Sequence, residues 1–519
     1  MGPTTTRVII ILSFMLLIPF ANAADSMDRL IAGLDHPLWT ARQNAVLRIA
    51  ETGNAGGAAI PALVRSLSDV EVEVRRAAVR ALAAVGHGSE DAVVGLVSAL
   101  EDDDWVVRRQ AALSFEDLQP TAAIAVPAIR EVLTSESSDV RTAAALALSG
   151  LAPDSRQALP ELVTALNAED WQLRAAAAHA IGALGEDARD ALPVLANALR
   201  DRDWGVAEQV VESLSRIGKP AIPVLIAALQ DPGLAVRWGS VRALGRIGQD
   251  ATEAVPALAT ALKDPSVQVR WAGARSLWAI GPAAAAATPE LVEALSDKDW
   301  VVRWSAARAL GAVADRSHID VTATSLAGAL RDQDSRVCEA AAFALEQIGP
   351  AAVSALPALS RAASWTGSNG ADNADSPICQ VIDVGPAIEE VLMESGWTVR
   401  WASVRALGVV GAGRPEALPP LTEALLDEEW QVRGIAALAI GQFGEDAPAA
   451  TVTAVARNLK DEHAAVRKAA AVALGEIGPP AHVEITGLRA AELDEDPAVR
   501  ESAGQSIRKV LGLQQGEYE

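Results

Sequence analysis

The chain has 519 residues and a formal net charge of −23 at pH 7. Because so large a negative charge repels phosphate groups, we expect neither nucleic acid nor an anionic membrane surface as a partner. Hydrophobic residues make up 50% of the chain, but the aromatic ones are uneven, with thirteen Trp against five Phe and one Tyr. A core of Ala, Leu and Val indicates closely packed helices, so the tryptophans need a separate explanation.

Residues 1–23 have the pattern of a secretory signal. Arg7 precedes an apolar run of 13 residues, from Val8 to Phe20, and the segment ends in Ala21-Asn22-Ala23. The run is shorter than the roughly 20 residues of a spanning helix, and small residues at positions −3 and −1 suit signal peptidase. We expect cleavage before Ala24 and a secreted or periplasmic protein with no membrane insertion after cleavage. The alternative is an uncleaved membrane anchor.

Beyond the signal, one motif recurs along the chain, as in LEDDDWVVR at 100–108 and LSDKDWVVR at 295–303. Its arginine returns mostly every 33 residues, at Arg42, Arg75, Arg108, Arg141, Arg174, Arg237, Arg270, Arg303, Arg400, Arg433, Arg467 and Arg500. The sequence therefore predicts an array of about 14–15 two-helix repeats of roughly 33 residues.

Each repeat carries start and stop signals for two helices. Proline is well tolerated at the beginning of a helix, and it is expected to begin the first helix at Pro127, Pro160, Pro193, Pro223, Pro256 and Pro289. Aspartate is a favoured N-cap, and it precedes the second helix at Asp104, Asp170, Asp203, Asp299 and Asp334. Glycine is favoured in a left-handed C-cap, and it stands eleven residues after the arginine position at Gly53, Gly86, Gly185, Gly218, Gly248, Gly281, Gly349, Gly444 and Gly478. No segment has the pattern of a strand.

With a Pro-led first helix, a loop Asp and Val-Arg at the start of the second helix, the units resemble HEAT repeats, in particular the short kind of the phycobilisome lyases. The resemblance covers roughly residues 28–511. It implies an all-α fold, a right-handed α-α superhelix of the HEAT/armadillo type, and a ladder of Asp–Arg pairs along the solenoid. The loop aspartates are Asp69, Asp102, Asp201, Asp231, Asp264, Asp297, Asp332, Asp427, Asp461 and Asp494. We interpret the arginines as structural, each bridging to loop carboxylates of its own or an adjacent unit.

The array is irregular at two arginine positions, which hold Ala207 and Cys338, and in the patternless stretch 363–377. We expect a repeat array over 24–360, an irregular loop or degenerate repeat over 361–385, a second part of the array over 386–511 and a tail over 512–519. The irregular stretch is interpreted as a surface loop that replaces most of a second helix. Cys338 and Cys379 flank it, and in an exported protein they could form a disulfide.

The tryptophans follow a register on the second helix. When the arginine is numbered zero, Val, Ala and Leu fill the core positions −1, +3 and +7, whereas Trp recurs at −3 and +1 and Arg at +5, roughly opposite the core face. Second helices line the concave side of HEAT-like arrays, so we predict a binding stripe there of Trp238, Arg242, Trp271, Arg275, Trp278, Trp300, Trp304, Arg308, Trp397, Trp401 and Arg405. The alternative is that the tryptophans seal the seam between repeats.

Nothing in the sequence indicates catalysis. The six histidines are scattered and none is followed by Glu, which argues against the HEAT-repeat deoxyhypusine hydroxylases and their His-Glu iron ligands. No phosphate-binding Gly loop or nucleophile motif occurs. We therefore expect no enzyme, no catalytic residue, no metal site and no cofactor, and we do not expect a small-molecule ligand.

The sequence is best explained as an extracytoplasmic scaffold that binds a protein or extended peptide in a concave groove lined by Trp and Arg. A carbohydrate-binding or polysaccharide-associated protein is one alternative, with the tryptophans stacking on sugar rings. A lyase-like or lyase-accessory HEAT protein is another, although a secretory signal argues against it.

Overall fold

A computed structural model describes residues 27–118, 121–365 and 396–513, and these ranges contain helices and turns but no strand. The predicted signal, the tail from 514, Cys379 and most of the predicted loop 361–385 lie outside the described residues. The chain forms two compact units, Met1–Glu161 and Leu162–Glu519. Within the described ranges the two units together contain fourteen helix pairs.

The first helices of the pairs are short. They are α1 (Met27–Gly33), α3 (Ile60–Ser66), α5 (Glu90–Ala99), α7 (Val126–Val132), α9 (Leu159–Ala165), α11 (Leu192–Ala198), α13 (Ile222–Ala228), α15 (Val255–Ala261), α17 (Thr288–Ala294), α19 (Ile319–Ala329), α21 (Leu356–Ala363), α24 (Leu418–Ala424), α26 (Ala449–Arg457) and α28 (Ile485–Ala491). Most follow a 3-10 segment, such as η6 (Gly248–Ala254) before α15 or η7 (Gly281–Ala287) before α17.

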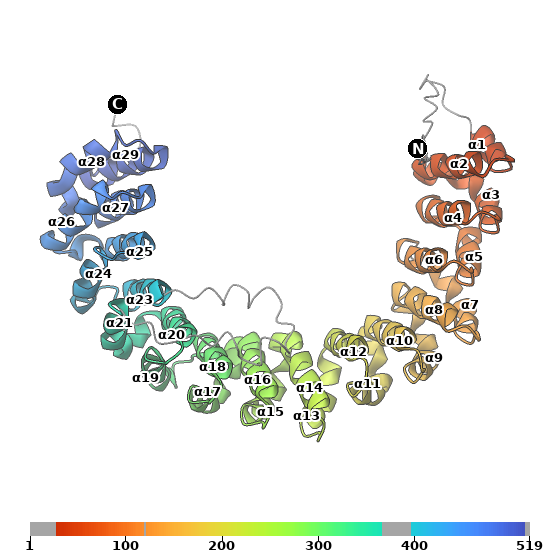
Figure 1. The fold of residues 1–519 in the computed structure, drawn as a ribbon, viewed down its shortest axis with the longest axis horizontal. Coiled ribbons are helices and arrows are strands. Elements are labelled where there is room, and N and C mark those ends of the chain that lie inside the picture. The colour runs from red at the N-terminus through yellow and green to blue at the C-terminus, as the bar shows by residue number, and fades with distance from the viewer. Residues whose placement is uncertain (1–26, 119–120, 366–395, 514–519) are drawn as a thin grey trace, which may run out of the picture. The chain divides into compact units, whose positions relative to one another are not determined.

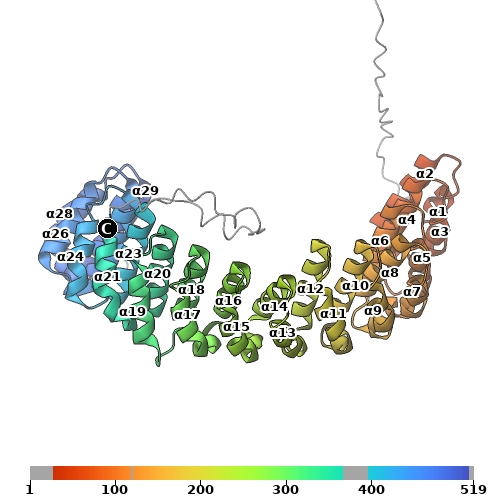
Figure 2. The ribbon, with the colours of Figure 1, turned by 60° about the horizontal axis from the view of Figure 1, so that its bottom comes forward.

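The second helices are longer and carry the arginine position. They are α2 (Trp39–Glu51), α4 (Val72–Val85), α6 (Trp105–Asp117), α8 (Ser138–Gly150), α10 (Trp171–Ala183), α12 (Trp204–Ile217), α14 (Leu234–Ile247), α16 (Val267–Ile280), α18 (Trp300–Val313), α20 (Ser335–Ile348), α23 (Gly396–Val410), α25 (Trp430–Gly441), α27 (Ala464–Ile477) and α29 (Pro497–Leu511). Within the second unit they pack side by side in one layer and the first helices form another (Figures 1 and 2). The all-α HEAT-type solenoid predicted from the sequence is confirmed.

The core consists of the predicted small and branched residues. Val302, Ala306 and Leu310, at positions −1, +3 and +7 of α18, are fully buried. The stretch Ser335–Ala363 is long and apolar enough to cross a membrane by length and composition alone. It comprises α20, η8 (Gly349–Ala355) and α21, whose Leu345 and Leu359 are buried in the same core. We therefore assign this stretch to the solenoid.

Helix ends follow the sequence signals closely. Asp104 and Asp203 accept hydrogen bonds from the first-turn amides of α6 and α12, as predicted for N-caps. Asp299 precedes α18 without capping it, and its Oδ2 accepts from Nη2 of Arg270 at 2.6 Å. Most of the predicted glycines have positive φ, Gly281 at 73° for example. Gly86 differs, with φ −86°.

The irregular segment does not replace a second helix. Helix α21 packs against α23, and α23 packs against α20, so α21 and α23 are the two helices of one complete repeat. The extra residues are therefore inserted between the two helices of that repeat. The sequence alone could not show that α21 and α23 belong to one repeat, because the inserted residues move Arg400 out of the 33-residue spacing. The helices themselves still pack in the regular order.

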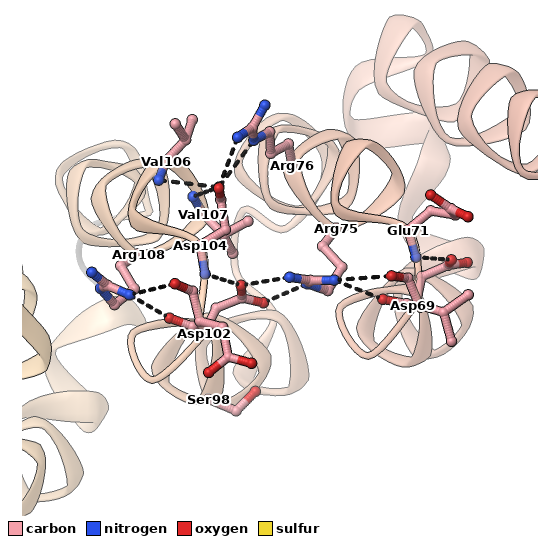
Figure 3. Close-up of polar contacts among 12 residues, drawn as sticks. Asp69, Glu71, Arg75, Arg76, Ser98, Asp102, Asp104, Val106, Val107 and Arg108 are labelled. Carbon is pink, nitrogen blue, oxygen red and sulfur yellow. Dashed lines mark hydrogen bonds and ion pairs between the residues drawn. The ribbon is translucent and has the colours of Figure 1, made fainter.

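The arginines form the predicted ladder and connect successive repeats (Figure 3). Arg75 donates from Nε and Nη2 to both oxygens of Asp102 at 2.7 and 2.9 Å, and from Nη1 to the carbonyl oxygen of Asp69 at 3.0 Å. Asp102 Oδ1 also accepts the backbone N–H of Asp104 at 2.8 Å. Arg75 thus joins the loop of its own repeat, through a backbone oxygen, to the loop carboxylate of the next. Arg108 differs, because it pairs with Asp139 inside α8, and Arg141 and Arg500 donate to backbone oxygens of their own loops.

The same pair recurs in both units, as Arg42–Asp69, Arg75–Asp102, Arg174–Asp201, Arg237–Asp264, Arg270–Asp297, Arg303–Asp332, Arg400–Asp427, Arg433–Asp461 and Arg467–Asp494. Their side chains are only 7–17% exposed. The hydrogen bonds from Arg42 hold the pKa of Asp69 below its ordinary value, and those to Asp102 raise the pKa of Arg75. Both partners therefore stay charged in the folded protein.

Where the arginine is missing, other groups take over its contacts. Beside Ala207, the next loop carboxylate, Asp231, is paired with Arg200 from the preceding turn. In α20, the buried Cys338 thiol donates to the carbonyl oxygen of Asp332 at 3.4 Å, the oxygen six residues back that a ladder arginine would contact. Burial raises the pKa of this thiol to about 12. The predicted bond to Cys379 stays a prediction, since Cys379 lies outside the described residues.

We predict that Asp201→Ala destabilises the second unit by about 3 kcal/mol, because it leaves the buried guanidinium of Arg174 without its carboxylate. The control is Glu293→Ala, which removes the exposed inter-repeat pair with Lys263 and should cause no measurable change. Urea unfolding followed by circular dichroism measures both variants. Equal effects of the two substitutions would contradict a structural role for the ladder.

Candidate functional site

The tryptophans of the second unit occupy the predicted register on the second helices. Positions −3, +1 and +5 relative to the arginine are four residues apart, so they form one stripe along each helix. Because the second helices lie side by side in one layer, the stripes of consecutive helices are neighbours (Figure 1). We call the surface formed by these stripes in the second unit the second-helix face.

Position −3 is the first residue of the second helix and is often open to solvent. Trp204 is 51% exposed and Trp171 is 49% exposed; in the first unit Trp105 is 61% exposed. Trp300 and Trp397, at the same position further along, are half-buried. Large apolar side chains left in solvent in consecutive repeats are typical of a surface that contacts another molecule.

Position +1 is more buried, and here the alternative of a seam holds in part. Trp271 is only 4% exposed, whereas Trp238, Trp304 and Trp401 are half-buried. The Nε1 atoms of Trp238, Trp271 and Trp300 are buried and have no acceptor among the described residues. These three indoles therefore cannot offer an N–H group to a ligand. Trp278, on the same helix as Trp271, is 40% exposed.

Aromatic rings and guanidinium groups stack in a row across α12, α14, α16 and α18. The rings of Trp204 and Trp238 stack with centroids 5.3 Å apart, and the Arg242 guanidinium lies 4.7 Å from the Trp238 centroid. Arg308 lies 5.1 Å from the ring of Trp278 and 4.9 Å from that of Trp304. Arg275 lies 5.7 Å from the Trp271 ring. The arginines are thus held against the rings by cation–π contacts.

The row continues over α20 and α23. Arg405 lies 5.3 Å from the Trp401 ring and 5.6 Å from that of Phe343, and the two rings meet edge to face at 6.0 Å. The Arg336 guanidinium lies 3.5 Å from the Trp300 centroid while it donates to both oxygens of Asp334. Sequence reasoning missed Arg336 and Phe343, because both lie outside the positions where Trp and Arg repeat.

Two of the four position +5 arginines on this face are neutralised by glutamates of the neighbouring helix. Arg242 donates to both carboxylate oxygens of Glu208 at 2.5 and 2.9 Å, and Arg405 donates to Glu346 at 2.8 Å. Arg246 contacts Glu208 and Glu212. Glu208 keeps its charge: burial favours its neutral form, but the hydrogen bonds from Arg242 outweigh this and lower its pKa.

A family model described as HEAT repeats matches residues 27–116, 93–182, 126–215, 159–234, 192–278, 255–346, 288–366 and 385–458. These ranges together cover most of the chain. The chain belongs to the HEAT-repeat family. No curated protein matches this HEAT-repeat protein.

Solved structures share its fold. Kap121p bound to Pho4p is similar over 93% of this chain and 57% of that chain, with a TM-score of 0.63 and 14% sequence identity. Kap121p bound to RanGTP is similar over 94% of this chain and 56% of that chain, with a TM-score of 0.60 and 14% identity. The HEAT-repeat protein therefore spans little more than half the length of Kap121p, and at this identity the likeness shows the fold alone.

The described part of the HEAT-repeat protein holds no group of three or more His, Cys, Asp or Glu side chains placed to bind a metal ion. Two of its histidines have side-chain partners: His179 shares a hydrogen bond with Gln209, and His318 with Asp315. Burial lowers the pKa of His179, which favours its neutral form. The arrangement on the second-helix face offers aromatic surface and guanidinium groups, which suit binding by stacking and by ion pairing.

Two tryptophans of α16 test which rings belong to the seam. Trp271→Ala should destabilise the protein by about 3–5 kcal/mol, because it leaves a cavity in the packing between second helices. Trp278→Ala should cost less than about 1.5 kcal/mol, since this residue is 40% exposed and its ring loses mainly its contact with Arg308. Thermal unfolding of the two variants compares them on one helix. Equal losses would show that both rings are structural.

Proposed function

We propose that this HEAT-repeat protein is a non-catalytic extracytoplasmic scaffold that binds another protein, or an extended peptide, on its second-helix face. The observation that carries the proposal is the row of stacked tryptophans and arginines over α12 to α18. Two of its rings remain accessible to a partner, since Trp204 is 51% exposed and Trp278 is 40% exposed. Aromatic residues and arginine dominate the energetics of protein interfaces.

The fold is consistent with this use. Kap121p, which has a similar fold, is seen bound to Pho4p and to RanGTP, so a solenoid of this kind can hold a protein partner. Repeat arrays offer long surfaces for such partners, because each repeat adds one pair of helices to the same face. The shared fold supports the proposal only in its architecture. The kind of partner is inferred from the tryptophans and arginines of the second-helix face.

Carbohydrate binding is the second candidate, and the row of tryptophans is the observation that favours it. Sugar recognition also needs hydrogen-bond partners for hydroxyl groups. The Nε1 atoms of Trp238, Trp271 and Trp300 are buried, so in this part of the face the indoles offer carbon edges and ring surface. A lyase-like role, which the sequence resemblance raised, remains a third candidate without a specific observation in its favour. We therefore favour a peptide or protein partner.

The extracytoplasmic setting is part of the proposal and rests on residues 1–23 of the sequence. N-terminal sequencing of the protein purified from its native source should begin at Ala24. A chain that still begins at Met1, or that is found in the cytoplasm, would contradict export. It would also remove the oxidising environment that a Cys338–Cys379 bond requires.

The binding surface is tested by removing its exposed rings. We predict that Trp204→Ala with Trp278→Ala lowers the affinity for a protein captured from the exported fraction at least about tenfold, with the helical circular dichroism signal unchanged. The control is Val483→Ala, which changes an exposed apolar residue in η14 (Pro479–Glu484), outside the second helices. Capture is followed by mass spectrometry and affinity by calorimetry.

A double variant that captures the same proteins with the same affinity would refute the proposed surface. A glycan array probed with both forms separates the second candidate. Binding of a glycan by the wild-type chain, lost in the double variant, would favour carbohydrate binding instead.

A further inference from the structure

The arginine at position +5 of α14 has a carboxylate partner on the second helix of the preceding repeat. Arg242 on α14 is paired with Glu208 on α12, 34 residues earlier. Glu208 directly follows the arginine position of its repeat, which holds Ala207, so it occupies position +1. The pair therefore joins position +5 of one repeat to position +1 of the repeat before it.

In the next two repeats this partner is replaced by tryptophan. The residues 37 earlier than Arg275 and Arg308, at position +1 of the preceding repeats, are Trp238 and Trp271. Helices α16 and α18, which carry the two arginines, contain no Asp or Glu at all. In the part of the chain that the structure describes, neither guanidinium forms an ion pair or hydrogen bond with a carboxylate, and both side chains are exposed.

The surroundings of the two arginines are otherwise positive. Partial loss of hydration lowers the pKa of Arg275, and the charges of Arg242 and Arg246 lower it further. Burial also lowers the pKa of Arg308, followed by the charge of Arg275. A guanidinium still remains protonated at neutral pH. Two uncompensated positive charges thus stand on adjacent helices in a chain whose net charge is −23.

We propose that Arg275 and Arg308 form a binding site for a pair of carboxylates on an extended, acidic segment of a protein partner. This inference rests on the proposed function, because it uses the same second-helix face. A guanidinium presents two parallel N–H donors that match a carboxylate, and these two carry no such group of their own. The exposed ring of Trp278, against which Arg308 is held, lies beside this site and can contact the methylene groups of a bound glutamate side chain.

The spacing of the helices indicates which segments fit. Packed helices lie about 8–10 Å apart, and an extended peptide advances about 3.3 Å per residue with alternate side chains on one face. Carboxylates two residues apart are then about 7 Å apart on the same face, within reach of two flexible arginines on neighbouring helices. We expect Glu-x-Glu to be the preferred pattern, with the middle side chain pointing away from the second-helix face.

The test uses fluorescently labelled nonapeptides with a central Glu-Val-Glu, flanked by Gly and Ser and blocked at both ends, and the same peptide with Gln-Val-Gln. Fluorescence anisotropy with the whole mature chain should show the Glu peptide binding at least about tenfold more tightly at low salt. About 0.5 M NaCl should remove most of this preference, because exposed ion pairs are screened. Moving the second Glu next to the first should weaken binding.

The variants assign the site. Arg275→Gln with Arg308→Gln should abolish the preference for the Glu peptide and leave the circular dichroism spectrum unchanged. Arg80→Gln is the matched control: Arg80 also occupies position +5, on α4, and is exposed, but it has no aromatic ring stacked on it in the described structure. This control should keep the preference in full.

Four results would overturn the inference. Equal affinity for the Glu and Gln peptides, both lost with the Trp204/Trp278 double variant, would leave the proposed function standing while refuting the carboxylate site. A Glu preference that survives in the Arg275/Arg308 variant would place it elsewhere. Tighter binding of oligogalacturonate than of the Glu peptide, abolished by the same two substitutions, would assign the arginines to an anionic glycan. Failure of both peptides to bind would also refute the site. The proposed function would then be tested separately, by the capture of exported proteins with the wild-type chain and the Trp204/Trp278 double variant.

Discussion

The ion pair between a second-helix arginine and the loop aspartate of the next repeat is the interaction on which the regularity of this solenoid depends. The guanidinium places two donors on the carboxylate and a third on backbone oxygens of its own loop, as Arg270 does with Asp297 and Asp264. The carboxylate in turn accepts the amide of Asp299 two residues further on. A nearly buried ion pair is tolerated only when its polar atoms are satisfied in this way. A core of Ala, Val and Leu is far less selective, so the ladder fixes the register between repeats.

Fixing the register places equivalent positions of consecutive repeats next to one another. Positions −1, +3 and +7 then lie in the core, and the ladder arginine contacts the loops. Positions −3, +1 and +5 are left on the second-helix face, where the fold does not dictate the residue. Tryptophan at −3 therefore ranges from the exposed Trp204 to the half-buried Trp300, and this freedom is what allows one face to carry a binding function on a structural scaffold.

The exchange of glutamate for tryptophan at position +1 has an electrostatic consequence. With Glu208 present, Arg242 is neutralised by its own protein and serves to hold rings in place. With Trp238 and Trp271 at the equivalent positions, Arg275 and Arg308 have no such carboxylate. Their rings come from other tryptophans: Trp271 for Arg275, and Trp278 and Trp304 for Arg308. A guanidinium stacked on an indole keeps its N–H edge free, because the cation–π contact uses the face of the group and leaves the edge for an anion. Tryptophan in place of glutamate at position +1 thus fills part of the seam between repeats and leaves a positive charge on the second-helix face.

Local features of the chain were determined by the sequence itself. The 33-residue spacing, the caps at Asp104 and Asp203, the left-handed Gly281 and the buried positions around Val302 all follow from contacts within one helix or one turn. The tertiary structure decided the rest. Arg270 takes its carboxylate from the next repeat, and Asp299 pairs with Arg270 and does not cap α18. Helices α21 and α23 form one repeat across the insertion, and Trp271 is buried while Trp278 is exposed. These outcomes depend on groups about 30 residues apart and on the space between packed helices. A periodic pattern specifies which side of a helix a residue occupies, but the neighbouring helix determines how much of that side it covers.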